Sequence, residues 1–252
     1  MSADALPPDR VVEVLNPTGA GEFILVCEHA SNFIPDELKN LGLEGDVLQS
    51  HIAWDPGAFL VAQAMSVELD APLIVPRISR LVYDCNRPPS AQSAVATESE
   101  VYEIPGNVGL SAEDRQARVS RFYEPFRDTL NANVQHKLAR GSNPILVTVH
   151  SFTSVFKGVS RDLDIGILHD VDSRLADALI KIFAEESALI VRRNEPYGPE
   201  DGVTYTLTEH ALPYGLPNVM IEIRNDLIDS PSSQQSMAEK LSKYLVKAGA
   251  VY

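Results

Sequence analysis

Short runs of hydrophobic residues recur along the chain and predict the strands of a buried sheet. Each run is rich in Val, Ile, Leu or Phe and is bounded by polar or turn-forming residues, as is typical of strands covered on both faces. The runs lie at residues 22–29, 73–76, 145–150, 164–169, 188–192 and 218–224, with a further edge strand at 11–15.

Helical periodicity separates these runs. Apolar side chains recur with the 3.6-residue period over residues 58–67 and again over 112–139, where Ser111 and Asp114 form an N-terminal capping pattern and Gly141 ends the helix. Further helices are expected at 173–186 and 231–249, and a short one opens at Pro35, whereas 203–215 fits either a helical turn or irregular structure. Strands and helices alternate, which predicts an α/β fold with a largely parallel sheet between helical layers.

The chain has 252 residues, a length at which α/β enzymes often form one domain, so we expect a single domain over 1–252. Residues 1–21 are interpreted as a surface lead-in. A long polar loop is expected from residue 77 to about 108. Loops of this length inside compact domains are usually functional or disordered, so this loop is a candidate active-site loop.

Composition and charge narrow the class of protein. The apolar fraction is 44% and the formal net charge is −14, which disfavours nucleic acid as a partner. The two cysteines, Cys27 and Cys85, do not make a disulfide framework, which favours a reducing compartment. The N-terminal residues lack the pattern of a signal peptide, and no apolar run approaches the length of a membrane span. We therefore expect a cytoplasmic protein with no membrane partner.

Chemically useful side chains stand at the ends of three predicted strands. His29, His150 and Glu222 follow or close hydrophobic runs, and ligands of open α/β sheets bind at the carboxyl ends of strands. Two histidines and one carboxylate, with water in the fourth position, form a common catalytic zinc shell. The carboxylate ligand is either Asp55 or Glu28. Asp55 is better placed because Glu28 and His29 are strand neighbours and should point to opposite faces.

Each of these residues also has a purely structural interpretation. A histidine at a strand end is often only hydrogen-bonded, and Asp55 could simply be an acid favoured by the start of a helix. Glu222 lies in an otherwise hydrophobic strand, where a carboxylate is costly unless it is paired or used. It is either the general base that activates a water molecule at a metal, or the salt-bridge partner of an arginine such as Arg224.

The segment from 80 to 87 brings Arg80, Asn86 and Arg87 into one loop. Arginine grips carboxylates through paired hydrogen bonds, and an acidic protein that binds an anionic substrate needs such a local positive patch. Taken alone, the segment could equally be a solvated loop with internal ion pairs.

Five motifs in order resemble the N-formylglutamate amidohydrolase family. Together they run from about residue 22 to 230. They are CEHASN at 27–32 with Ile34-Pro35, Asp55-x-Gly57-Ala58, Ser79-Arg80 with Asn86-Arg87-Pro88, VHSF at 149–152, and IEIRND at 221–226. The family is similar to zinc carboxypeptidases, aspartoacylases and cell-wall amidases of the phosphorylase/hydrolase-like fold. The resemblance therefore implies a three-layer sandwich with a central mixed, mostly parallel sheet.

The resemblance also implies a site and an activity. His29, Asp55 and His150 would hold one zinc per chain, or another divalent metal, and Glu222 would be the general base. The residues expected to bind the substrate are Arg80, Asn86, Arg87 and Arg224, while His51 and His210 lie in matching stretches without an assigned role. The implied activity is hydrolysis of the amide bond of a small anionic N-acyl amino acid, such as N-formyl-L-glutamate or a relative.

Other functions remain open at this stage. The protein could cleave a different N-acyl or peptidoglycan-like amide, although the 77–108 loop suggests a lid over a small substrate. It could also be a non-catalytic binding protein that keeps the fold without metal. Cys27 is a poor candidate nucleophile because a thiolate is disfavoured inside a hydrophobic strand.

Overall fold

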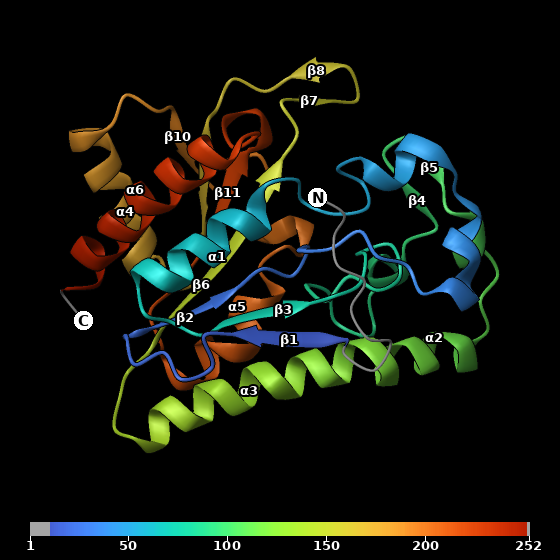
Figure 1. Ribbon diagram of the computed structural model, residues 1–252, viewed down its shortest axis with the longest axis horizontal. Coiled ribbons are helices and arrows are strands. Elements are labelled where there is room, and N and C mark those ends of the chain that lie inside the picture. The colour runs from blue at the N-terminus through green and yellow to red at the C-terminus, as the bar shows by residue number, and fades with distance from the viewer. Residues whose placement is uncertain (1–10, 251–252) are drawn as a thin grey trace.

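A seven-stranded mixed sheet organises the protein (Figure 1). The structure is a computed structural model and describes residues 11–250. Its strand order is β1-β3-β2-β6-β11-β9-β10. The strands are β1 Val12–Leu15, β2 Phe23–Val26, β3 Leu73–Pro76, β6 Ile145–Phe152, β9 Ile165–Leu168, β10 Val191–Arg193 and β11 Asn218–Arg224. The first ten residues of the expected lead-in, and residues 251–252, lie outside the described residues.

The centre of the sheet is parallel and its edges are not. β3, β2, β6 and β11 run in the same direction, β1 is antiparallel to β3, and the parallel pair β9–β10 is antiparallel to β11. The carboxyl ends of the four central strands therefore meet at one edge of the sheet. The predicted α/β class and the mixed, mostly parallel sheet are confirmed.

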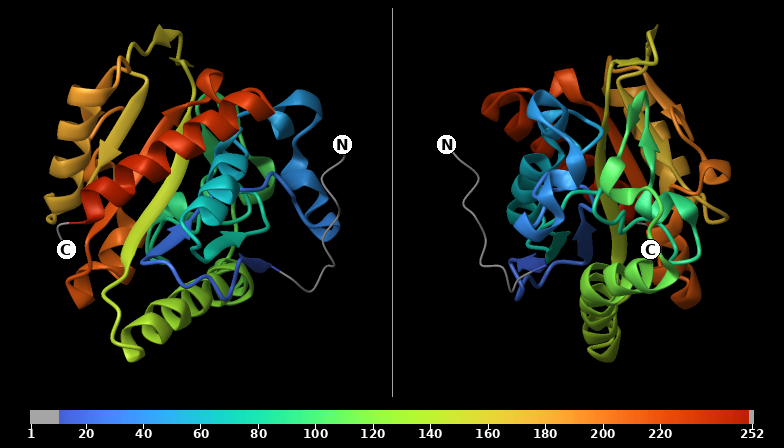
Figure 2. Two further views of the ribbon diagram at one scale, coloured as in Figure 1. Left: turned by 60° about the vertical axis from the view of Figure 1, so that its left-hand side comes forward. Right: turned by 90° about the vertical axis from the view of Figure 1, so that its right-hand side faces the viewer.

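Helices cover both faces of the sheet, which gives three layers. On one face lie α1 Ala58–Glu68, α4 Arg174–Glu186 and α6 Pro231–Gly249, packed over Val147, Val149 and Ile221. The other face carries α2 Ala112–Arg118, α3 Glu124–Ala139 and α5 Tyr205–His210. The three helices of the first face cross in front of the sheet in Figure 1, and Figure 2 shows the layers from two further sides.

Several boundaries differ from the sequence-based prediction. β2 ends at Val26 instead of residue 29, and β6 continues past His150 to Phe152. The strand expected at 188–192 occupies 191–193. The helix predicted over 112–139 is divided by a π-helical turn at Val119–Tyr123 between α2 and α3. In each case the hydrophobic pattern is continuous, so pairing and local backbone geometry decide where the element stops.

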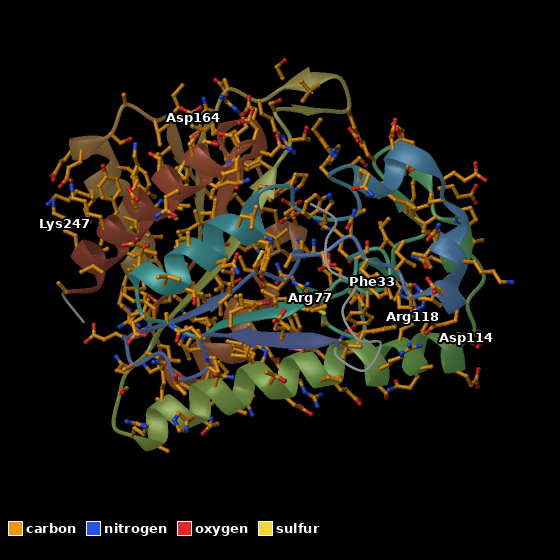
Figure 3. The ribbon with its side chains drawn as sticks, viewed as in Figure 1. Phe33, Arg77, Asp114, Arg118, Asp164 and Lys247 are labelled. Atoms are coloured by element: carbon orange, nitrogen blue, oxygen red, sulfur yellow. The ribbon has the colours of Figure 1, made fainter. Side chains whose placement is uncertain are left out.

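The 77–108 segment forms a packed wall of the protein, and its expected role as a lid over a small substrate stays a prediction. Many of its apolar side chains are buried in the second core cluster, among them Ile78, Leu81 and Tyr83, whereas Val101 and Val108 are exposed. Arg118 of α2 donates hydrogen bonds to the Val82 carbonyl at 3.0 Å and to the Asn107 side chain at 2.6 Å, and Figure 3 labels it beside this segment. Buried contacts and internal hydrogen bonds hold this segment, whose regular structure is confined to short 3₁₀ turns and one small hairpin.

Short elements complete the chain. Two small hairpins are formed by β4 Glu98–Ser99 with β5 Tyr102–Glu103 and by β7 Val155–Phe156 with β8 Val159–Ser160. The second hairpin projects from the top of the molecule in Figure 1. Single 3₁₀ segments lie at Asp36–Gly42, Gly45–Gln49, Gln92–Val95, Pro105–Asn107, Pro199–Asp201, Leu212–Tyr214 and Asn225–Leu227. Within residues 11–250, no helix has both the length and the apolar composition needed to cross a bilayer.

Candidate active site

The histidines and the acidic groups predicted from the sequence converge where β2, β6 and β11 end. His150 and Glu222 are directly opposite each other in the parallel pairing of β6 with β11. Cross-strand partners point to the same face of a sheet, so both side chains enter the layer of the 77–108 wall. His29 follows the end of β2, and its carbonyl accepts a hydrogen bond from the backbone N–H of Asp55 at 3.0 Å.

Three ligand atoms form a compact triangle at this point. Asp55 Oδ2 lies 3.2 Å from His29 Nδ1 and 2.9 Å from His150 Nδ1, and the two imidazole nitrogens are 3.2 Å apart. All three residues are buried. A tetrahedral zinc ion with bonds of about 2.0–2.1 Å separates its nitrogen and oxygen ligands by about 3.3 Å. The triangle therefore has the size of one face of such a coordination shell.

Two further carboxylates contact the Nε2 atoms of the imidazoles, which face away from the triangle. His29 Nε2 is hydrogen-bonded to Asp84 Oδ1 at 2.8 Å, and His150 Nε2 lies 2.9 Å from Glu28 Oε2. Histidine ligands of metals usually direct their second ring nitrogen at a carboxylate or carbonyl in this way. This arrangement keeps the proton of each neutral ring on Nε2 and leaves Nδ1 free to bind a cation.

The chemistry of this donor set fits a divalent cation. With the protons on Nε2, two nitrogen lone pairs and one carboxylate oxygen converge within 3.2 Å, which is repulsive unless a positive charge lies between them. Burial alone would lower the pKa of His29 and of His150, but the surrounding carboxylates raise both, that of His150 well above its usual value. The cluster thus attracts positive charge, which a metal ion or protons can supply.

Asp55 is presented by a sharp turn before α1. Its side chain lies against the Nδ1 atoms of the two histidines and accepts a hydrogen bond from the backbone N–H of Ser151, and α1 has no side-chain cap at its N-terminus. Gly57 makes this turn possible because it has a φ of 83°, and a Cβ there would lie 2.5 Å from the Ile228 carbonyl oxygen. The helix-start role that could have explained Asp55 is not the one its side chain plays.

Glu222 is a buried carboxyl with an unusual pKa. Its side chain is 4% exposed and lines the cavity, and it makes no hydrogen bond or ion pair with the residues between 11 and 250. Burial raises the pKa of Glu222 to about 7, with a further contribution from Asp55, while His150 and His29 oppose the shift. A carboxyl that titrates near neutral pH is suited to accept and return a proton.

A cavity of about 640 Å³ opens beside these groups. Its walls come from the strand ends, from the 77–108 wall, and from the segments around 151–161 and 196–203. They include His29, Asp55, Asp84, Glu222 and three arginines, Arg80, Arg87 and Arg161. The cavity thus combines a possible metal site, a candidate base and positively charged side chains.

The residues expected to bind the substrate differ in how far contacts within the protein already occupy their hydrogen-bond donors. Arg80 is paired with Asp55 at 3.5 Å and with Asp84 at 3.2 Å. The Asn86 amide donates to the Val203 carbonyl at 2.5 Å and accepts from Thr206, so it is held inside the protein fold. Arg87 lines the cavity, and its hydrogen bonds to residues 11–250 are donated only by Nη1, to the carbonyls of Asn86 and Gly202.

Arg224 is not brought into the cavity with the others. It pairs with Asp164 at 3.0 Å and with Asp226 at 2.7 Å, and Figure 3 labels Asp164 near the opposite end of the molecule from Arg118. Arg224 lies two residues beyond Glu222, at the end of β11. It is also not the salt-bridge partner that was considered for Glu222.

The remaining candidates are two histidines and two cysteines, and their environments differ. His51 lines the cavity and lies 3.1 Å from Glu100, whereas His210 is buried outside the cavity, and burial lowers its pKa to about 4. Cys27 and Cys85 are free and buried. Burial, together with Asp55 and Glu28, raises the pKa of the Cys27 thiol well above its usual value, which disfavours a thiolate nucleophile.

Sequence reasoning missed one carboxylate and misjudged another. Asp84 lies in the 80–87 segment and was not among the candidate site residues, yet it contacts His29 directly. Glu28 was expected to point away from His29 by strand alternation, but β2 ends at Val26, so the alternation does not extend to residues 28 and 29. The sequence signal for Asp84 was its place between Arg80 and Asn86 in one matching motif.

A central mixed sheet with a buried His-Asp-His cluster at its carboxyl edge is typical of metal-dependent hydrolases. The sequence profile of the N-formylglutamate amidohydrolase family matches residues 21–229, so the chain belongs to this family. A search of curated protein sequences found no match.

Two solved structures are similar to this chain. The crystal structure of a gene product from Agrobacterium tumefaciens shares 52% identity over 96% of both chains, with a TM-score of 0.94. The N-formylglutamate amidohydrolase from Ralstonia eutropha JMP134 has a TM-score of 0.54 and 16% identity, covering 94% of this chain and 98% of that one. The similarity to the Agrobacterium tumefaciens protein covers nearly the entire chain. The similarity to the Ralstonia eutropha protein is evidence for the fold and for nothing more.

Proposed function

We propose that this protein is a metal-dependent amidohydrolase that cleaves the amide bond of a small N-acyl amino acid, with N-formyl-L-glutamate or a relative as substrate. The observation that carries the proposal is the convergence of His29 Nδ1, His150 Nδ1 and Asp55 Oδ2 beside Glu222 in one cavity. Membership of the N-formylglutamate amidohydrolase family supports the type of bond.

His29, Asp55 and His150 would hold one divalent cation, with zinc as the first choice for two imidazoles and a carboxylate. When bound, zinc lowers the pKa of a water molecule and polarises a carbonyl group. Asp84 and Glu28 fix the two rings, so that both Nδ1 atoms face the same point. This support makes the ligand geometry independent of the substrate.

Glu222 would act as the proton carrier. As a carboxylate it accepts the proton of the attacking water, and as a carboxylic acid it returns that proton to the departing amine. The pKa of about 7 places both forms within reach at neutral pH. Its freedom from hydrogen bonds within the described residues leaves both carboxyl oxygens available to water and substrate.

Arg80 and Arg87 would orient the substrate. Arg87 has a free guanidinium edge for the carboxylate of the amino acid, since only its Nη1 is engaged. Arg80 lies between Asp55 and Asp84, so it adds positive charge beside the reacting carbonyl, where negative charge develops. Asn86 would contribute indirectly, by holding the segment at 203–206 against Arg87.

The proposal is tested by measuring bound metal and the amino acid released by hydrolysis on the same preparations. Wild type is expected to bind about one zinc per chain and to hydrolyse N-formyl-L-glutamate, with N-acetyl amino acids as comparison substrates. His150→Ala should lose the metal and the activity, whereas Glu222→Gln should keep the metal and lose about 100-fold or more in kcat. His136→Ala, an exposed histidine on α3, is the matched control.

Two outcomes would overturn parts of the proposal. Wild type that binds no zinc after reconstitution would favour a non-catalytic binding protein. Zinc binding without turnover of any small N-acyl amino acid would direct the search to larger amides, such as peptidoglycan fragments.

A further inference from the structure

Arg161 is held in an aromatic cradle on the wall of the cavity. Its guanidinium carbon lies 4.6 Å from the ring centre of Phe156, 4.9 Å from that of Tyr197 and 5.6 Å from that of Phe152. The three rings come from β7, from the segment after β10 and from the end of β6, and all three line the cavity. Aromatic faces on several sides fix the plane of a guanidinium group.

The hydrogen bonds of Arg161 leave one edge of this group free. Nη1 donates to the Tyr197 hydroxyl at 3.1 Å and to the Thr153 carbonyl at 3.4 Å. Nε and Nη2 have no partner between residues 11 and 250, and no carboxylate in that range forms an ion pair with Arg161. A fixed guanidinium with two open donors is arranged for a bidentate contact with a carboxylate.

The cavity therefore presents two free guanidinium groups. Arg87 and Arg161 are each anchored through Nη1 by oxygen atoms of the protein, and neither forms an ion pair within the described part of the chain. Arg80 differs because Asp55 and Asp84 already balance its charge. One free arginine suits the carboxylate shared by all N-acyl amino acids, and a second suits an additional negative charge.

Arg161 also lies near the reacting groups. Tyr197, which accepts its hydrogen bond, is within electrostatic range of Glu222 and Arg80: burial and Glu222 raise the pKa of Tyr197, while Arg161 and Arg80 oppose that shift. Arg161, the three rings of its cradle and the candidate base Glu222 all line the same cavity.

We propose that Arg161 determines the specificity of this site by binding a second carboxylate, at the end of the substrate's side chain, while Arg87 binds the first. This inference rests on the proposed function and deepens it by naming the residue that recognises the acidic side chain of the substrate. The aromatic cradle sets the position of the guanidinium without neutralising it.

A purely structural role for Arg161 is the competing explanation. The same contacts could serve only to clip the β7–β8 hairpin onto Phe152 and Tyr197. The two roles predict different effects of replacing Arg161. Loss of a structural contact would affect all substrates equally, whereas loss of a carboxylate-binding residue would affect only substrates with the second charge.

The kinetic experiment compares N-formyl-L-glutamate with N-formyl-L-glutamine, which has the same shape without the second charge. Wild type should prefer the glutamate compound in kcat/KM by about 10- to 100-fold, the range of a charged hydrogen-bonded contact. Arg161→Met should reduce that preference to less than about 3-fold, mainly through KM, and Arg161→Lys should restore part of it. Equal losses for both substrates in Arg161→Met would overturn the proposal.

Lys157→Met is the matched control. Lys157 lies 5.6 Å from the same Phe156 ring and carries the same charge, but it is exposed and outside the cavity lining. Its removal should leave the preference unchanged. Melting temperatures of the variants separate misfolding from altered recognition.

A binding experiment distinguishes failure of this inference from failure of the proposed function. Zinc-reconstituted wild type and Arg161→Met are titrated calorimetrically with glutarate and with glutarate monoamide. If no N-formyl substrate is hydrolysed but wild type prefers glutarate and the variant does not, Arg161 keeps its role and the activity was misassigned. If wild type binds both compounds equally, the second carboxylate site does not exist.

Discussion

At the residue scale, the site is defined by how its carboxylates are partnered. Glu28, Asp55 and Asp84 each contact a histidine, and Glu222 does not. Histidine and arginine contacts hold the pKa of Asp55 and of Asp84 low despite burial, whereas burial raises the pKa of Glu222. Groups whose environments separate their pKa values take different roles, here ligand support and proton transfer.

Glu222→Gln should stabilise the metal-free protein at alkaline pH. The pKa of about 7 in the folded state exceeds the ordinary value of 4.5, so the folded protein binds the proton more tightly. The contribution of the Glu222 carboxyl to the free energy of unfolding is therefore fully present below pH 4.5 and is lost as pH rises through 7. Glutamine does not titrate, so the variant avoids this loss. Relative to wild type, its free energy of unfolding should rise by about 2 kcal/mol between pH 5 and pH 8.

Urea unfolding in the presence of a chelator measures this difference at the two pH values. A gain that is the same at pH 5 and pH 8 would show that the carboxyl of Glu222 does not titrate in this range. Glu113→Gln, an exposed position in the first turn of α2, serves as the control.

Asp84→Asn should weaken metal binding without removing a ligand. The Asp84 carboxylate accepts from His29 Nε2 and also receives Arg80. Loss of such a supporting carboxylate typically costs about 10- to 100-fold in metal affinity. Competition with a zinc-binding dye gives the affinity, and Asp114→Asn on α2 is the control. Unchanged affinity would mean that the histidine is oriented by other contacts.

At the scale of elements, turns and strand ends position the ligands. The approach of Gly57 to Ile228 brings Asp55 to the histidines, and the pairing of β6 with β11 places Glu222 beside His150. The wall at 77–108 adds Asp84 and Arg80 from the third side. Each element is held by packing that is remote from the chemistry, which allows the buried polar groups to be assembled.

Gly57→Ala should be more destabilising than an alanine at another glycine with positive φ. Both Gly57 and Gly141 adopt φ values near 80°, but only at Gly57 does the new Cβ meet a backbone oxygen. Gly141→Ala should cost about 1 kcal/mol from backbone strain alone. Gly57→Ala should cost about 3 kcal/mol and displace Asp55. Urea unfolding and zinc affinity check both effects, and equal costs at the two positions would contradict the expectation.

At the scale of the whole molecule, the sheet brings segments together that are far apart in the sequence. His29 and His150 are separated by 121 positions, and their Nδ1 atoms are 3.2 Å apart. The cluster of Glu28, Asp55, Asp84 and Glu222 carries an excess of negative charge that Arg80 only partly balances. A bound divalent cation should therefore stabilise the entire fold.

Zinc should raise the thermal stability of wild type. A ligand that binds only the folded state at 1,000 times its dissociation constant contributes about 4 kcal/mol. Differential scanning fluorimetry with and without zinc measures this effect, and a chelator should reverse it. His150→Ala should show a much smaller shift, and an equal shift in that variant would place the stabilising zinc at another site.

The sequence by itself determined the elements and much of the chemistry. Hydrophobic periodicity predicts strands 73–76 and 218–224 and the helices that became α1, α4 and α6, because burial of apolar side chains depends on local spacing. Ordered motifs also indicate the family, and with it His29, Asp55, His150 and Glu222 as candidates.

Only the tertiary structure decided how these residues meet. It ended β2 at Val26 and so brought Glu28 to His150, it placed Asp84 on His29, and it turned Arg224 toward Asp164 and Asp226. It also showed that Arg161 has an aromatic cradle and, among residues 11–250, no carboxylate partner. These contacts join residues that are distant along the chain, and no local pattern encodes such distances, because they arise from strand pairing and layer packing.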